Sequence, residues 1–166
     1  AYERLRLVIR NEAFRLGVLR DSTAISTEEK SAYIRIIEEK DTSSDIVDSL
    51  KMLCILLEKH YGQKVILLID EYDVPLDKAY AHGYYEQMID LIRAMFGAAL
   101  KTNDSLFMAV LTGCLRVSKE SIFTGLNNLK VYSISDMQCD EYFGFTDAEV
   151  RKMLADYALD AHYEDM

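Results

Sequence analysis

The chain has 166 residues, of which 50% are hydrophobic and 28% charged, a composition typical of one ordinary globular domain. Lys and Arg number 19 against 28 Asp and Glu, and the net charge of −9 argues against direct nucleic-acid binding, which needs clustered basic residues. No apolar stretch reaches the ~20 residues of a membrane span. The cysteines at 54, 114 and 139 form no C-x-x-C pair, so we expect reduced thiols in a cytoplasmic protein.

The N-terminal part, residues 1–62, predicts three helices. They run over Tyr2–Phe14, from a capping box of Ser26 and Glu29 to about Glu38, and from the polar break Asp41–Ser44 to near His60. In the first helix Leu5, Ile9 and Ala13 recur at four-residue spacing, which places them on one face. No start signal precedes this helix, so we expect the domain to be truncated at the N-terminus.

Strands and helices alternate in the central part, residues 63–135. Apolar runs predict strands at Val65–Ile69, Leu106–Leu111 and Lys130–Ile134, with a loop at Asp73–Gly83, a helix over Met88–Ala99 and a polar segment at Arg116–Asn128 between them. The C-terminal part, residues 136–166, holds a helix opened by a capping box of Thr146 and Glu149. The alternation predicts an α/β fold with a parallel sheet flanked by helices, in a single partial domain.

The strand at Val65–Ile69 is the most informative segment. Five apolar residues without alternation predict a strand buried on both faces. Asp70 and Glu71 follow at its carboxyl end, where open α/β sheets bind their ligands. Because consecutive strand residues point to opposite sides, one carboxylate can reach a metal ion while the other faces a water molecule.

This pattern has the form of a Walker B segment, in which Asp70 holds the shell of a Mg²⁺ ion and Glu71 orients or deprotonates the attacking water. Acidic residues are also common at strand ends without any function, but the apolar run directly before this pair favours the functional interpretation. Asp73 is either a second metal-binding carboxylate or the cap of the turn before Pro75, and the sequence leaves both open.

The second predicted strand runs directly into Thr112, which stands where a polar sensor residue would contact a phosphate or the attacking water. A plain strand-end cap is the alternative. Arg116 is a candidate arginine finger, because a planar guanidinium suits phosphate, and a solvated arginine is its alternative. Asn127 and Asn128, in the same polar segment, are further candidates for binding the cofactor. His60, His82 and His162 share no zinc-ligand spacing.

Four runs of sequence together resemble the predicted AAA-ATPase-like family. They are VILLIDEYDVP from Val65, HGYY from His82, VLTGCLRVSKESIFTGLNNL from Val110 and FGFTDAEV from Phe143. The resemblance implies a three-layer P-loop NTPase fold that uses ATP and Mg²⁺, with Asp70 and Glu71 as Walker B, Thr112 as sensor and Arg116 as a further candidate. Members of the family are bacterial and archaeal proteins in which a nuclease-like domain follows the ATPase module.

The chain departs from the family in one respect. No G-x-x-x-x-G-K-[ST] loop occurs in its 166 residues, whereas family members carry this loop and a further strand upstream. That loop supplies the N–H groups and the lysine that hold phosphates. We therefore expect ATP hydrolysis from the parent protein, and neither tight nucleotide binding nor activity from this polypeptide alone.

Two other functions stay open at this stage. One is a non-catalytic NTPase-like module that binds partner proteins. The other is a metal-dependent nuclease site at Asp70, Glu71 and Asp73, which is disfavoured because no lysine follows these carboxylates at nuclease spacing and the strand end lacks basic surroundings. A truncated sheet also exposes an edge through which the chain could self-associate.

Overall fold

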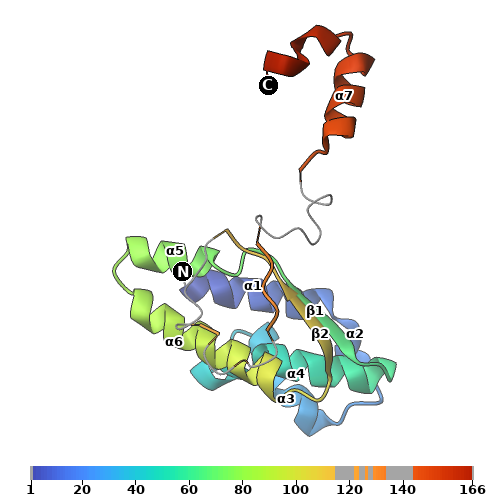
Figure 1. Cartoon of the computed structure of the whole chain (residues 1–166). Helices are drawn as coiled ribbons and strands as arrows, with labels where there is room; N and C mark the ends of the chain where they lie inside the picture. Colours follow the sequence, from blue (N-terminus) through green and yellow to red (C-terminus); the bar gives the residue numbers. More distant parts are fainter. Residues whose placement is uncertain (1, 115–121, 124–125, 127–128, 134–143, 166) are drawn as a thin grey trace. The chain divides into compact units, whose positions relative to one another are not determined.

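The computed structural model describes residues 2–114, 122–123, 126, 129–133 and 144–165 (Figure 1). The chain divides into two compact units, Ala1–Asn127 and Asn128–Met166. The first unit contains α1 (Tyr2–Arg15), α2 (Val18–Asp21), α3 (Thr27–Ile37), α4 (Ser43–Tyr61), β1 (Val65–Ile69), α5 (Val74–Ala81), α6 (Tyr85–Phe96), the π-helical turn η1 (Gly97–Lys101) and β2 (Leu106–Leu111). The second contains α7 (Asp147–Asp156) and the 3₁₀ helix η3 (Asp160–Asp165).

Helices α3 and α4 begin where the local sequence signals place them. Ser26 and Glu29 form the predicted capping box of α3, and Thr42 forms another with Asp45 at the start of α4. Helix α4 ends at Gly62, whose φ of 68° lies in the left-handed region that glycine adopts at low cost. These caps satisfy N–H and C=O groups that have no partner inside the helix, so short-range chemistry fixes the boundaries.

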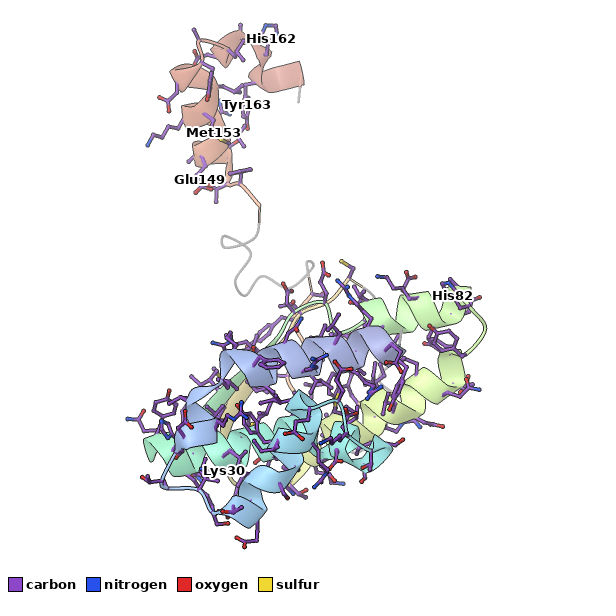
Figure 2. The ribbon with its side chains drawn as sticks, turned by 180° about the vertical axis from the view of Figure 1, so that it is seen from behind. Lys30, His82, Glu149, Met153, His162 and Tyr163 are labelled. Carbon is purple, nitrogen blue, oxygen red and sulfur yellow. The ribbon has the colours of Figure 1, made fainter. Side chains whose placement is uncertain are left out.

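The core of the first unit lies among its helices. Tyr33, Leu19, Ile36, Ile46 and Leu56 are fully buried there. The Tyr33 hydroxyl donates to the carbonyls of Ala13 (3.1 Å) and Leu16 (3.2 Å), so this large buried side chain also satisfies its polar end. Lys30 of α3, labelled in Figure 2, donates from Nζ to the carbonyls of Arg20 (3.0 Å) and Ser22 (2.6 Å) and so holds the end of α2.

The sheet of the described residues has two parallel strands. Strand β1 pairs with β2 from Val65 opposite Leu106 to Ile69 opposite Leu111, with an irregularity between Val65 and Ile66. One face packs on the helices, where α4 contacts β1. The parallel pairing and the surrounding helices confirm an α/β fold. A three-layer sheet stays a prediction.

The prediction that β1 is buried on both faces is wrong. Ile66 and Leu68 are 52% and 72% exposed, while Val65, Leu67 and Ile69 are half-buried. On β2, Phe107, Met108 and Val110 are exposed as well. A continuous apolar run permits burial on two faces, but only helices on both sides can provide it, and the helices described in the first unit pack on one side.

Two further local predictions need correction. The segment expected as a loop at Asp73–Gly83 contains helix α5, because Pro75 lies in the first helical turn, where proline is tolerated, and Leu76 and Ala79 are fully buried. The strand expected at Lys130–Ile134 is absent from the described residues 129–133, where Val131 and Tyr132 are exposed instead of paired.

The second unit is a helix followed by a 3₁₀ turn. Thr146 and Glu149, the latter labelled in Figure 2, form the predicted capping box of α7. The Arg151 guanidinium lies 3.7 Å from the centre of the Tyr163 ring and also pairs with Asp147 at 2.9 Å. In the part of the chain that the structure describes, no helix is both long and apolar enough to cross a membrane.

Asp45 of α4 provides a test of the packing between α3 and α4 in the first unit. Its carboxylate accepts from Arg35 Nε at 3.0 Å and from the Thr42 N–H at 2.9 Å. The hydrogen bond from Arg35, assisted by Thr42, holds the pKa of Asp45 well below its ordinary value. We expect Asp45→Asn to lower the free energy of unfolding by about 2 kcal/mol at pH 7, because it removes a charged cap and an ion pair.

The pH dependence has a definite sign. A carboxyl group whose pKa is depressed by folding stabilises above its unfolded pKa of about 4, and that contribution is lost as the pH falls towards the folded value. The difference in free energy of unfolding between the wild type and Asp45→Asn, measured with urea, should therefore shrink as the pH is lowered from about 4 to 2, because the wild type loses this contribution. Asp48→Asn on the exposed face of α4 is the control. An equal loss in both variants would contradict this role of Asp45.

Candidate functional site

The parallel strands end at one edge of the sheet, and the candidate residues follow directly. After Ile69 the chain continues into Asp70 and Glu71, and after Leu111 into Thr112 and Gly113. The Thr112 N–H donates to the Ile69 carbonyl at 2.9 Å, and the Tyr72 N–H donates to the Thr112 carbonyl at 3.0 Å. These two backbone bonds continue the sheet ladder past both strands and bring their ends together.

The Thr112 hydroxyl connects both carboxylate-bearing residues. It donates to Oδ1 of Asp70 and lies 3.4 Å from the Glu71 N–H, which donates to it. Asp70, Glu71 and Thr112 are all exposed. Three residues chosen from the sequence are thus neighbours at the carboxyl edge of the sheet, although 42 positions separate Asp70 from Thr112.

Glu71 has an unusual backbone. Its φ is 51°, in the left-handed region where a residue with a Cβ atom is held at a cost of about 1–2 kcal/mol. The turn that it makes is closed by the Val74 N–H, which donates to the Glu71 carbonyl at 3.1 Å. Strain of this kind persists only where surrounding contacts enforce it, and such positions cluster at functional sites.

Asp73 lies in a different environment from Asp70. It is 4% exposed and stands at the N-terminal end of α5, where its carbonyl accepts from the N–H groups of Leu76 (2.9 Å) and Asp77 (3.0 Å). Among the described residues no group of three or more His, Cys, Asp or Glu side chains is arranged to hold a metal ion. The role of Asp73 as a second metal ligand stays a prediction.

The remaining predicted residues lie outside the described part of the chain. Arg116 falls in the undescribed range 115–121, and Asn127 and Asn128 fall in another. Their proximity to the strand ends stays a prediction.

Sequence reasoning missed the contribution of Tyr72 and Gly113. The Tyr72 ring packs edge-on against Phe123, with 5.4 Å between the ring centres. Phe123 in turn stacks on the buried Phe96, with 6.3 Å between the ring centres. The same Tyr72 ring lies against Gly113, where no side chain intervenes. A glycine after a strand-end threonine was visible in the sequence, but the close approach of an aromatic ring to it is a tertiary contact.

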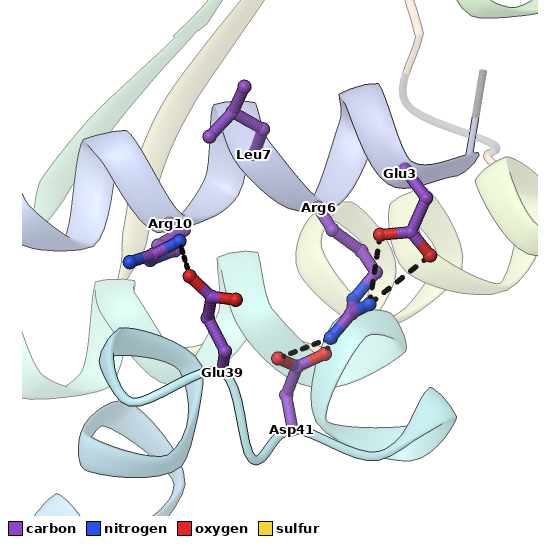
Figure 3. A pocket seen from close by; sticks show the side chains of 6 residues that line it. All are labelled: Glu3, Arg6, Leu7, Arg10, Glu39 and Asp41. Carbon is purple, nitrogen blue, oxygen red and sulfur yellow. Dashed lines mark hydrogen bonds and ion pairs between the residues drawn. The ribbon is translucent and has the colours of Figure 1, made fainter.

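A second charged cluster lines a surface pocket of about 210 Å³, and none of the strand-end residues is part of that lining. Figure 3 shows that its charged side chains pair with one another. Arg6 pairs with Glu3 at 3.0 Å and Asp41 at 2.9 Å, and Arg10 pairs with Glu39. Both arginines already have carboxylate partners. We therefore interpret these ion pairs as contacts that hold α1 against the α3–α4 connection, and not as an anion-binding site.

Comparison with known proteins gives a family match that includes the strand-end residues. The sequence matches the family described as Predicted AAA-ATPase over residues 14–123, a range that holds both strands and the residues from Asp70 to Gly113. The chain belongs to the predicted AAA-ATPase family. The α/β fold and the strand-end cluster described above therefore lie in a member of this family.

One relative is a protein of Azotobacter chroococcum mcd 1, described as an uncharacterized protein in the vnfD 5' region. It is 32% identical over 95 residues, which cover 57% of this chain and 18% of that protein. The chain thus corresponds to under a fifth of this relative's length. No solved structure matches.

The Thr112 bridge can be tested locally. Thr112→Val removes the hydroxyl that accepts from the Glu71 N–H, and we expect hydrogen exchange of that amide to accelerate about fivefold, as for the loss of a bond worth ~1 kcal/mol. Thr112→Ser keeps an oxygen at this place and should retain the protection. Equal exchange in the Val and Ser variants would show that the hydroxyl does not hold the turn.

Proposed function

We propose that Asp70 and Glu71 are the Walker B carboxylates of a Mg²⁺-dependent ATPase. The observation that carries the proposal is the strand-end cluster, in which the Thr112 hydroxyl joins the Asp70 carboxylate and the Glu71 backbone. Membership of the predicted AAA-ATPase family supports it. Ligands of α/β proteins bind at this edge of the sheet, beyond the carboxyl ends of the strands.

The donor chemistry fits a Mg²⁺ ion. Hard carboxylate and hydroxyl oxygens are the ligands that Mg²⁺ accepts, and it keeps several waters when only one or two carboxylates are offered. In the proposed site Asp70 holds the hydrated ion, and Thr112 fixes the orientation of that carboxylate. When bound, Mg²⁺ neutralises phosphate charge.

Glu71 and Thr112 have separate proposed roles. Glu71 orients the attacking water and takes its proton, for which its exposed carboxylate is suited. Thr112 is the sensor residue beside it. Arg116 as arginine finger, and Asn127 and Asn128 as nucleotide contacts, complete the proposal and lie outside the described residues.

The phosphate-binding half of the site is proposed to come from elsewhere in a longer protein. No G-x-x-x-x-G-K-[ST] loop occurs in these 166 residues, and the matched segment covers 18% of the Azotobacter relative. We propose that the parent, in the cytoplasm and with a nuclease-like domain downstream, hydrolyses ATP. The 166-residue chain alone is proposed to be inactive and to hold no nucleotide tightly.

One observation favours the alternative of a protein-interaction module. The outer face of the sheet exposes four apolar side chains, and apolar patches of this kind often mark contact surfaces. They are the paired residues Ile66 and Met108, and Leu68 and Val110. Self-association through this face or the adjoining edge belongs to the same alternative. ATP binding by the parent protein would separate the two functions.

Glu71→Gln tests the ATPase proposal in the parent protein. The amide keeps the size of the side chain but cannot accept the proton of water, so we expect kcat to fall at least about 100-fold while ATP binding persists. The control is Glu86→Gln, an exposed glutamate in the first turn of α6. Steady-state hydrolysis and calorimetric binding of ATP are the measurements. Unchanged hydrolysis in Glu71→Gln would reject the assignment.

A further inference from the structure

Gly113 occupies a position with no room for a side chain. A Cβ atom built there would lie 2.7 Å from Cε1 and 2.9 Å from Cδ1 of Tyr72, and 2.8 Å from Oδ1 of Asp73. Of the glycines that the structure describes, it alone has neighbours closer than 3.0 Å. Its φ is not in the left-handed region, so it is the space, and not backbone freedom, that requires glycine here.

The Tyr72 ring cannot leave this position without losing other contacts. It packs edge-on against Phe123 at 5.4 Å, and Phe123 stacks on Phe96, which is buried. The backbone of Tyr72 is fixed as well, because its N–H donates to the Thr112 carbonyl at 3.0 Å. The residue after Glu71 is thus held by its ring and by its main chain against the end of β2.

These contacts surround the strained residue. Glu71, with φ at 51°, is preceded by Asp70, which the Thr112 hydroxyl holds, and is followed by Tyr72 and the buried Asp73. We propose that Gly113 is a positioning residue: its missing side chain lets Tyr72 and Asp73 close against β2, and this closure fixes the left-handed turn that presents Glu71 and Asp70. Its catalytic consequence rests on the proposed ATPase function, whereas its structural consequence does not.

An added methyl group has two possible effects, and both disturb the site. Either the Tyr72 ring moves and loses its contact with Phe123, or the end of β2 moves and breaks two bonds, one from the Thr112 hydroxyl to Asp70 and one from the Tyr72 N–H to the Thr112 carbonyl. The Asp73 carboxylate is the more tolerant neighbour, since it is the end of a side chain. The collision with the ring therefore decides the outcome.

The structural test uses the 166-residue chain. Gly113→Ala should speed hydrogen exchange of the Glu71 and Tyr72 amides at least about tenfold, because the turn that protects them opens. Gly97→Ala is the matched control, since an added Cβ at Gly97 meets no atom within 4 Å and the backbone there is helical. Exchange at Glu71 and Tyr72 that is the same in Gly113→Ala as in Gly97→Ala would overturn the proposal.

The functional test uses ATP hydrolysis by the parent protein. We expect Gly113→Ala to lower kcat by about 100-fold, as a displacement of about 1 Å at a catalytic group can do, with the KM for ATP changed by less than about threefold. In a Tyr72→Ala background, where the ring is gone, adding Gly113→Ala should lower kcat less than about threefold further. General damage to the fold would instead add to the loss in that background and overturn the proposal.

The two measurements separate this inference from the function on which it rests. A parent protein that does not hydrolyse ATP would reject the ATPase proposal, and amide exchange would still decide whether Gly113 holds the turn. If Gly113→Ala does not fold, the test is whether the double variant Tyr72→Ala/Gly113→Ala folds. Restored folding in the double variant supports the proposal, and continued failure to fold overturns it.

Discussion

The two backbone hydrogen bonds of Thr112, to the Ile69 carbonyl and from the Tyr72 N–H, are the contacts on which the candidate site depends. They extend the parallel ladder past the last residues of β1 and β2 and fix the register of the two strand ends. The side-chain contacts follow from that alignment. With Thr112 held in this register, its hydroxyl reaches Asp70 and Glu71, and Gly113 comes against the ring of Tyr72.

Local chemistry made much of this structure predictable. The capping boxes at Ser26 and Thr146 need only residues three positions apart, and both form as expected. The strands at 65–69 and 106–111 also have the predicted bounds, because apolar runs next to turn residues define them. The proximity of Asp70 to Thr112 followed from the general rule that parallel strands end at one edge.

Other features depended on tertiary packing and could not be obtained from the sequence. The sequence predicts a loop at Asp73–Gly83, but Pro75 is in the first turn of α5, where the burial of Leu76 and Ala79 stabilises the helix. The apolar run of β1 could not reveal that Ile66 and Leu68 on its outer face are exposed among the described residues. The approach of Tyr72 to Gly113 depends on Phe123 and on the register of two strands, neither of which a motif encodes.

The most direct test of the proposed Mg²⁺–ATP site is paramagnetic broadening of backbone amide signals in the parent protein when Mn²⁺ and ATP are added. If Asp70, Glu71 and Thr112 hold the metal–nucleotide complex, their amide signals should broaden most. Broadening centred on another surface, or no broadening when ATP is bound, would contradict the proposed role of the strand ends.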